Sequence, residues 1–85
     1  MSHDDNISPQ PILLGLLMSK PSHGYELHQE FSRELGRVWR IGLSQLYAQL
    51  KQMAESGLVT VETELQANRP SRKVYHLTSQ GKRAF

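Results

Sequence analysis

The spacing of apolar residues changes at Gly57, and this change limits the folds that the 85-residue chain can adopt. Before Gly57, apolar residues recur every three or four positions, which predicts helices. Over residues 59–66 apolar and polar residues alternate, which is typical of a β-strand with one buried face. A second strand is expected over residues 72–77. Because a two-stranded hairpin is not stable alone, it must pack on the helices.

Three helices are expected in the first part of the chain. The first runs from Ser8-Pro9 to Lys20-Pro21, the second covers residues 23–35 and the third covers residues 43–56. Ser8 is expected to cap the first helix with its hydroxyl, with Pro9 in the first turn. Gly36 is expected at the C′ position of the second helix. Trp39, in the connector to the third helix, is expected to fill the core.

The hairpin is expected to turn over residues 67–71. Alternation predicts that Val59, Val61, Thr63 and Leu65 form the buried face of its first strand. In its second strand, Tyr75 and Leu77 are expected to point inward. Thr78 is placed to cap a fourth helix that has barely begun at Phe85.

The fold class predicted is therefore mostly α with a small β-hairpin, a winged helix-turn-helix with three helices, a two-stranded wing and the start of a fourth helix. Residues 1–8 are expected to form a disordered N-terminal tail and residues 9–85 the domain. The first helix is apolar on nearly all sides, so Leu16 and Met18 are expected to contact a second subunit.

Composition excludes several classes of protein. The chain has no cysteine, which rules out disulfides and thiolate metal sites. The longest apolar stretch, residues 12–18, is too short to span a bilayer, and the acidic N-terminus is unlike a secretory signal. We therefore expect a cytoplasmic protein with no membrane contact. His23 and His28 are five residues apart, not the i, i+4 spacing of zinc ligands on one helical face. No catalytic motif is found, so we expect no enzyme, no metal and no cofactor.

The third helix of such a fold enters the major groove of DNA. Its face opposite the apolar residues carries small, amide and basic side chains that can reach bases or phosphates, namely Ser44, Gln45, Ala48, Lys51 and Gln52. Tyr47, on the shoulder of the helix, could contact a phosphate or cover the edge of the core. A plain solvated helix face is the competing interpretation of this set.

Positive charge gathers at the end of the chain, where five basic and no acidic residues follow residue 68. Arg69, Arg72 and Lys73 lie in the predicted wing and are candidates for contacts with the DNA backbone. Tyr25 begins the second helix, where free backbone N–H groups could also meet a phosphate. A solubilising surface would show the same charge pattern, so charge alone leaves both interpretations open.

The ordered set of motifs resembles the N-terminal domain of the PadR family of transcriptional regulators. The similar segments are residues 12–17, 23–27, 46–47, 57–59 and 72–78. Ser44-Gln45 depart from the small residues, often Gly-Thr, that the family commonly has before its Leu-Tyr pair. Since this departure lies on the predicted base-reading face, the operator sequence cannot be carried over from the family.

The resemblance implies a homodimeric repressor that binds a near-palindromic operator in double-stranded DNA and is released by a small aromatic effector such as a phenolic acid. It implies that the first and last helices form the dimer, and that the C-terminal dimerisation helix is absent or truncated here. A winged-helix module that mediates protein–protein contacts without DNA remains the alternative. Charge reversal at Arg69 and Arg72 would distinguish the two functions.

Overall fold

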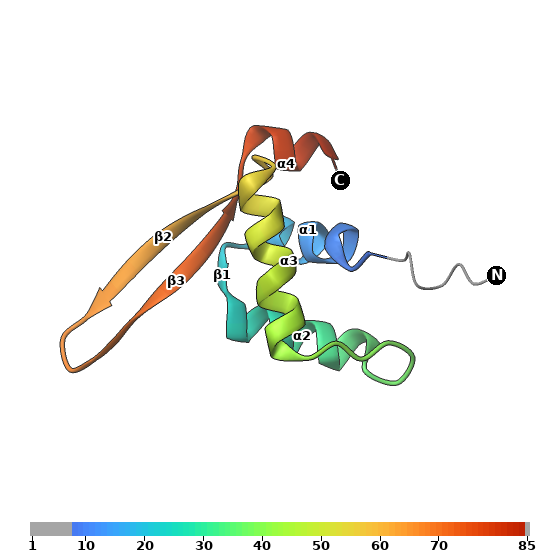
Figure 1. Cartoon of the computed structure of the whole chain (residues 1–85), viewed down its shortest axis with the longest axis horizontal. Helices are drawn as coiled ribbons and strands as arrows, with labels where there is room; N and C mark the ends of the chain where they lie inside the picture. The colour runs from blue at the N-terminus through green and yellow to red at the C-terminus, as the bar shows by residue number, and fades with distance from the viewer. Residues whose placement is uncertain (1–7, 85) are drawn as a thin grey trace.

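The computed structural model describes residues 8–84 and contains four helices and a three-stranded sheet (Figure 1). In chain order the elements are α1 (Gln10–Ser19), β1 (Ser22–His23), α2 (Gly24–Leu35), α3 (Leu43–Glu55), β2 (Val59–Gln66), β3 (Arg69–Leu77) and α4 (Ser79–Ala84). Helices α1 to α3 form the body, and the hairpin of β2 and β3 projects from it as a wing. The winged helix-turn-helix predicted from the sequence is confirmed.

One apolar core lies between the three helices and the base of the wing. Its buried residues are Leu13, Leu14, Leu17, Leu27, Phe31, Leu46, Leu50, Met53, Val59 and Tyr75. Trp39 packs against this core, and its ring meets Phe31 edge to face at a centroid distance of 5.4 Å. The expectation that Trp39 fills the core is confirmed. The core fixes α3 against α1 and α2 and leaves its opposite side free.

The sheet has a third strand that the sequence did not reveal. The strand order is β1-β3-β2, and both pairings are antiparallel. In β1, Ser22 pairs with Tyr75 and His23 pairs with Val74. Two residues show no alternation, so β1 is too short to be found from its sequence pattern. It joins the start of α2 directly to the base of the wing.

The prediction of a buried face along all of β2 is wrong. Val59 is buried, but Val61 is 42% exposed and Leu65 is 84% exposed. Figure 1 shows the reason, because the hairpin extends past the helices and no helix covers its outer half. The alternation therefore marks a strand here without marking its burial.

The predicted turn over residues 67–71 is also wrong. Gln66 pairs with Arg69, so only Ala67 and Asn68 form the turn, and β3 begins at Arg69. The register shifts between Glu64 and Gln66, where β3 holds one more residue than β2. Pro70 falls within this irregularity, which suits a residue that has no N–H to donate to the ladder.

The helix ends differ from the expectations at two positions. The N-cap of α1 is Pro9, while the Ser8 hydroxyl accepts a hydrogen bond from the Gln10 backbone N–H at 3.1 Å. Gly36 caps α2 with right-handed backbone angles (φ −59°), so it is not a left-handed C′ residue. The left-handed glycine is Gly57 after α3, at φ +82°. Apart from Ser8, the predicted tail lies outside the described residues.

Helix α4 is fixed by its first turn. The Thr78 hydroxyl accepts a hydrogen bond from the Gly81 N–H at 2.9 Å and donates one to the Gly57 carbonyl at 2.7 Å. The expected N-cap is therefore confirmed. Gly81 packs so closely that an added Cβ would lie 2.1 Å from the Leu58 carbonyl oxygen. This contact attaches α4 to the turn between α3 and β2.

Candidate nucleic-acid interface

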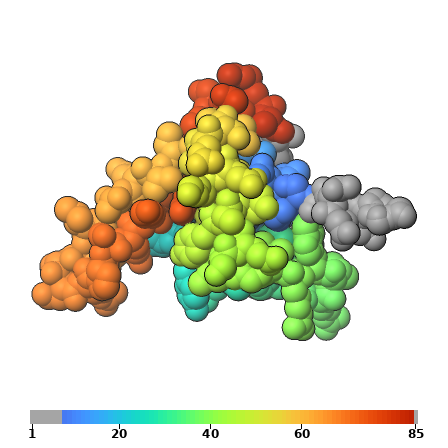
Figure 2. Space-filling model, viewed as in Figure 1, coloured from blue at the N-terminus to red at the C-terminus, as the bar shows by residue number. Residues whose placement is uncertain are grey.

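Helix α3 presents an exposed face beside the wing. Leu46, Leu50 and Met53 are fully buried on its inner side. The residues predicted for DNA on this helix are all exposed, namely Ser44, Gln45, Tyr47, Ala48, Lys51 and Gln52. In Figure 1 the helix lies in front of α1 and α2, and Figure 2 shows it as a ridge at the centre of this face. The core thus positions these six side chains on one accessible element.

Both glutamines of α3 that were predicted to contact DNA already hold hydrogen bonds inside the chain. The Gln45 side-chain oxygen accepts a bond from the Gly42 backbone N–H at 2.9 Å, which satisfies a free donor at the start of α3. The Gln52 side-chain oxygen lies 3.3 Å from the Gln10 amide nitrogen, which also donates to Gln49 at 2.8 Å. Because bidentate pairing with adenine uses both ends of the amide, these glutamines would have to leave their partners to pair in that way.

The two predicted tyrosines lie at the start of α2, with Tyr25 in its first turn and Tyr47 of α3 packed against Gly24. Tyr25 is 57% exposed and Tyr47 is 41% exposed. The Tyr47 ring covers Gly24, where an added Cβ would lie 2.3 Å from Tyr47 Cε1. The ring therefore packs against the backbone of α2 while part of it stays accessible. Both interpretations given for Tyr47, packing and an outward hydroxyl, fit this position.

A cleft of about 570 Å³ separates the start of α2 from the wing. It is lined by residues of α2, α3 and β3 together with β1, namely His23, Gly24, Tyr25, Glu26, Tyr47, Ser71, Arg72 and Lys73. Four of the residues predicted from the sequence, Tyr25, Tyr47, Arg72 and Lys73, thus share one surface. The cleft could receive a phosphate group, since hydroxyls and cations line it.

The three predicted wing cations are all exposed but differ in their partners. Arg72 Nε lies 2.8 Å from Glu64 Oε1, and this guanidinium holds the pKa of the Glu64 carboxyl below its ordinary value of 4.5. Within the described part of the chain, neither Arg69 nor Lys73 has a carboxylate at ion-pair distance. Arg69 and Lys73 are therefore available to an external anion, while Arg72 is already paired.

Adjacent residues of a strand project to opposite faces, so Arg72 and Lys73 border the cleft from opposite faces of β3. Lys73 shares its face with Tyr75, and Arg72 shares its face with Glu64, its partner across the strands. With Glu62 and Glu64 on β2, the wing is less positive than its second strand alone indicated. The sequence interpretation counted only the end of the chain and omitted these two carboxylates.

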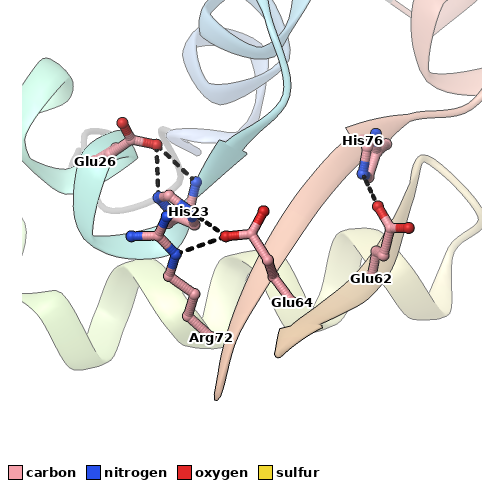
Figure 3. Close-up of polar contacts among 6 residues, drawn as sticks. All are labelled: His23, Glu26, Glu62, Glu64, Arg72 and His76. Carbon is pink, nitrogen blue, oxygen red and sulfur yellow. Dashed lines mark hydrogen bonds and ion pairs between the residues drawn. The ribbon is translucent and has the colours of Figure 1, made fainter. Parts of the chain in front are cut away.

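Sequence reasoning missed two groups of residues near this surface. Arg40 is exposed and lines a groove next to α3 with Gln45 and Ala48. The basic residues of its connector, Arg37 and Arg40, were a visible signal. His23, by contrast, joins α2 to Glu64 of the wing (Figure 3), and only the fold brings these two residues together.

Over residues 8–84 no group of three or more metal-ligating side chains is found, and no helix among them has the length and hydropathy to cross a membrane.

Residues 13–85 match the sequence model of the "Transcriptional regulator PadR-like family". The chain belongs to this family. The resemblance noted in the sequence is confirmed, and because the named relatives are transcriptional regulators, the expectation of no enzymatic activity is confirmed as well.

Two curated relatives share more than a third of their aligned residues with the chain. The negative transcriptional regulator PadR of Bacillus subtilis is 37% identical over 70 residues, which are 82% of this chain and 38% of that protein. A protein of Mycobacterium tuberculosis named as a transcriptional regulator is 36% identical over 74 residues, 87% of this chain and 39% of its own length. The chain thus spans about two fifths of the relatives it matches.

Solved structures of several transcriptional regulators have the same fold. Bacillus subtilis PadR in complex with operator DNA superposes with a TM-score of 0.80 at 35% identity, over 88% of this chain and 43% of that one. PadR of the same organism with p-coumaric acid gives 0.74 at 33% identity, over 89% of this chain and 40% of that one. A regulator from Thermoplasma acidophilum superposes with a TM-score of 0.80 at 31% identity, over 88% of this chain and 70% of that one.

Proposed function

We propose that the chain is the sequence-specific DNA-binding part of a PadR-like regulator, with α3 in the major groove and the wing on the flanking backbone. The observation that carries this is the exposed face of α3 beside a projecting wing, in a fold that also occurs in a relative crystallised with operator DNA. A helix about 10–12 Å wide fits a major groove of about 12 Å.

In this arrangement Ser44, Ala48 and Lys51 face bases or nearby phosphates without breaking any contact. Gln45 and Gln52 contribute through their amide N–H₂ groups, since their oxygens hold bonds within the chain. An N–H₂ group can donate to guanine, adenine or thymine acceptors in the major groove. With both glutamine oxygens occupied, neither Gln45 nor Gln52 makes a bidentate contact with adenine. Sequence preference then depends on single hydrogen bonds from their N–H₂ groups and on the other residues of this face.

The backbone contacts would come from the wing and the cleft beside it. Arg69 and Lys73 carry charge with no acidic partner in the described chain, so they neutralise phosphates. Tyr25 and Tyr47 donate hydroxyl hydrogen bonds to phosphate oxygens at the cleft. Arg72 keeps its bond to Glu64 and contributes to phosphate binding only through its remaining N–H groups.

The finer proposal is a cytoplasmic homodimer of the full-length protein that represses at a near-palindromic operator and is released by a small aromatic effector. Two findings on Bacillus subtilis PadR support it: this relative is named a negative transcriptional regulator, and it has been crystallised in complex with p-coumaric acid. An apolar groove of about 490 Å³ along α1 offers a surface for self-association. Leu16 lines this groove, and Met18 is 48% exposed at the end of the same helix.

Selection from a random-sequence duplex library tests this function, followed by affinity measurements on the selected duplex at several salt concentrations. We expect an enriched motif and an affinity that falls steeply with salt. The paired substitution Arg69→Glu with Lys73→Glu should abolish binding, and Lys82→Glu with Arg83→Glu, at exposed positions on α4, serves as the matched charge control. No enriched motif, or equal loss in both variants, would instead favour a protein-contact module.

A further inference from the structure

Four charged or titratable side chains join the wing to the start of α2. They are His23, Glu26, Glu64 and Arg72, named here the His23 cluster (Figure 3). His23 Nδ1 lies 2.8 Å from Glu26 Oε1, and its Nε2 lies 3.6 Å from Glu64 Oε1. Arg72 Nε lies 2.8 Å from the same Glu64 oxygen. The cluster therefore runs from α2 through β1 to both strands of the wing.

Both ring nitrogens of His23 face a carboxylate oxygen. An ionised carboxylate only accepts hydrogen bonds, and a neutral imidazole carries a single N–H. A neutral ring can therefore donate to Glu26 or to Glu64 but presents a lone pair to the other. Only the protonated ring, with an N–H at each nitrogen, attracts both carboxylates at once.

The two carboxylates are held in their ionised form. The backbone N–H of His23 donates to Glu26 at 3.1 Å, and this bond lowers the pKa of Glu26. The Arg72 guanidinium lowers the pKa of Glu64. Both carboxyls therefore stay charged well below neutral pH and remain acceptors for the His23 ring.

The cluster lies where the wing leaves the body, so it can affect the orientation of the wing. The backbone of His23 pairs with Val74, which is the outermost ladder contact between the body and the wing. Glu64 pairs with Arg72, two residues further toward the tip. The contact between the His23 ring and Glu64 thus extends the attachment by two residues, about 7 Å along the strand.

We propose that His23 is a positioning residue for DNA binding, whose protonated imidazole holds Glu64 and so fixes the wing relative to α2 and α3. Loss of the proton removes the charge attraction to Glu64 and leaves the wing attached by its backbone ladder and its packed base, with a wider range of orientations. Arg69 and Lys73 then reach the DNA backbone less often in the correct place. This inference rests on the proposed DNA-binding function, but its structural part can be measured without DNA.

Other charged and titratable side chains surround His23. The charged and titratable side chains that share its cleft are Tyr25, Glu26, Tyr47, Arg72 and Lys73, and Glu64 faces it from β2. Lys73 and Arg72 disfavour a second positive charge, while the two carboxylates favour it.

The wing offers a matched control. His76 Nε2 lies 3.0 Å from Glu62 Oε1, which is a histidine–glutamate pair within the hairpin. This pair joins β3 to β2 and does not reach α2 (Figure 3). His76→Gln therefore removes a pair of the same chemistry from the wing and leaves the connection to the body intact.

The first test measures the wing without DNA. The chain has no cysteine, so Asn68→Cys at the wing tip and Ser32→Cys on α2 allow two dyes to be attached at exposed positions. Time-resolved energy transfer then gives the distribution of their distances. We expect a narrow distribution near pH 6 that broadens near pH 8, a broad one at both pH values in His23→Gln and Glu64→Gln, and wild-type behaviour in His76→Gln.

The second test measures affinity for a duplex selected by the chain. From about pH 6 to pH 8 the wild type and His76→Gln should lose about two- to fivefold in affinity, the effect of one exposed ion pair. His23→Gln should show the weaker affinity at both pH values, and Glu64→Gln, which also releases Arg72 from its ion pair, should show an affinity that does not change between the two pH values. Glu64→Gln substitutes an exposed side chain, so it reports even where His23→Gln disturbs the start of α2.

The outcomes separate the two proposals. Equal distance distributions in the wild type, His23→Gln and Glu64→Gln at both pH values would overturn the role of His23, whatever the DNA measurements show. Failure of the wild type to select any duplex would overturn DNA binding, while the dye measurement would still decide the role of His23. A pH dependence that His76→Gln abolishes would also contradict the assignment to His23.

Discussion

The contact between Gly24 and Tyr47 predicts that a methyl group on α2 weakens DNA binding without unfolding the chain. An added Cβ at Gly24 would lie 2.3 Å from Tyr47 Cε1, whereas ordinary contacts begin at 3.4 Å. The difference, 1.1 Å, is the smallest shift that the ring must make in Gly24→Ala. Tyr47 is 41% exposed, so the ring has room to move outward.

The expected stability change is small because two effects oppose each other. Alanine is favoured over glycine in a helix by up to about 1 kcal/mol, and displacing the ring loses a comparable amount of packing. For DNA, a shift of this size removes the proposed bond between the Tyr47 hydroxyl and a phosphate. Since a hydrogen bond to a charged group contributes roughly 1.5–3 kcal/mol, we expect affinity to fall by about tenfold or more.

A double-mutant cycle measured by fluorescence anisotropy on a selected duplex checks this prediction. Tyr47→Phe removes the hydroxyl without moving the ring and should give a similar loss. If both changes act through that hydroxyl, Gly24→Ala combined with Tyr47→Phe should cost no more than either alone. Additive losses, or wild-type affinity for Gly24→Ala beside a weakened Tyr47→Phe, would refute the assigned role of the ring position.

Three further predictions follow from the site and the core. Lys73→Ala should lower the slope of log affinity against log salt by about 1, because one phosphate contact is lost, whereas Arg72→Gln should leave the slope nearly unchanged; equal slopes for the two variants would contradict their different assignments. Leu50→Ala should cost about 2–5 kcal/mol in urea unfolding, since Leu50 is fully buried, and a loss below about 1 kcal/mol would argue against the described core. The pKa values of Glu26 and Glu64 are lowered in the folded chain, by the His23 N–H and the Arg72 guanidinium respectively, so their stabilisation is complete above the ordinary value of 4.5 and is lost as pH falls below it. Thermal unfolding should therefore shift to lower temperature on acidification, and this shift should be smaller in Glu26→Gln and Glu64→Gln than in the wild type.

The helices and the order of elements were predictable because each helix carries a long periodic signal. Leu46, Leu50 and Met53 lie three and four residues apart, and all three are fully buried. The left-handed Gly57 marks the end of α3 in the structure as in the sequence. Such local patterns reflect the geometry of the element itself, so they survive in the fold.

Features that depend on the relative placement of elements were not predictable. The two residues of β1 give no pattern, and the exposure of Leu65 depends on how far the wing projects. The pairing of Arg72 with Glu64 depends on the register of the hairpin, which the expected five-residue turn had wrong. The candidate DNA residues on α3 were placed on an exposed face as expected, but their contact with DNA remains a prediction.

NMR mapping of a selected duplex onto the chain tests most directly whether α3 and the wing together bind DNA. The largest amide shift changes are expected at Ser44, Ala48 and Lys51 on α3 and at Lys73 on the wing. Amides of α1 should change little, because this helix lies behind α3 (Figure 1). Changes concentrated on α1 or α4, with Ser44 and Lys51 unaffected by a duplex that binds, would contradict DNA recognition by this surface.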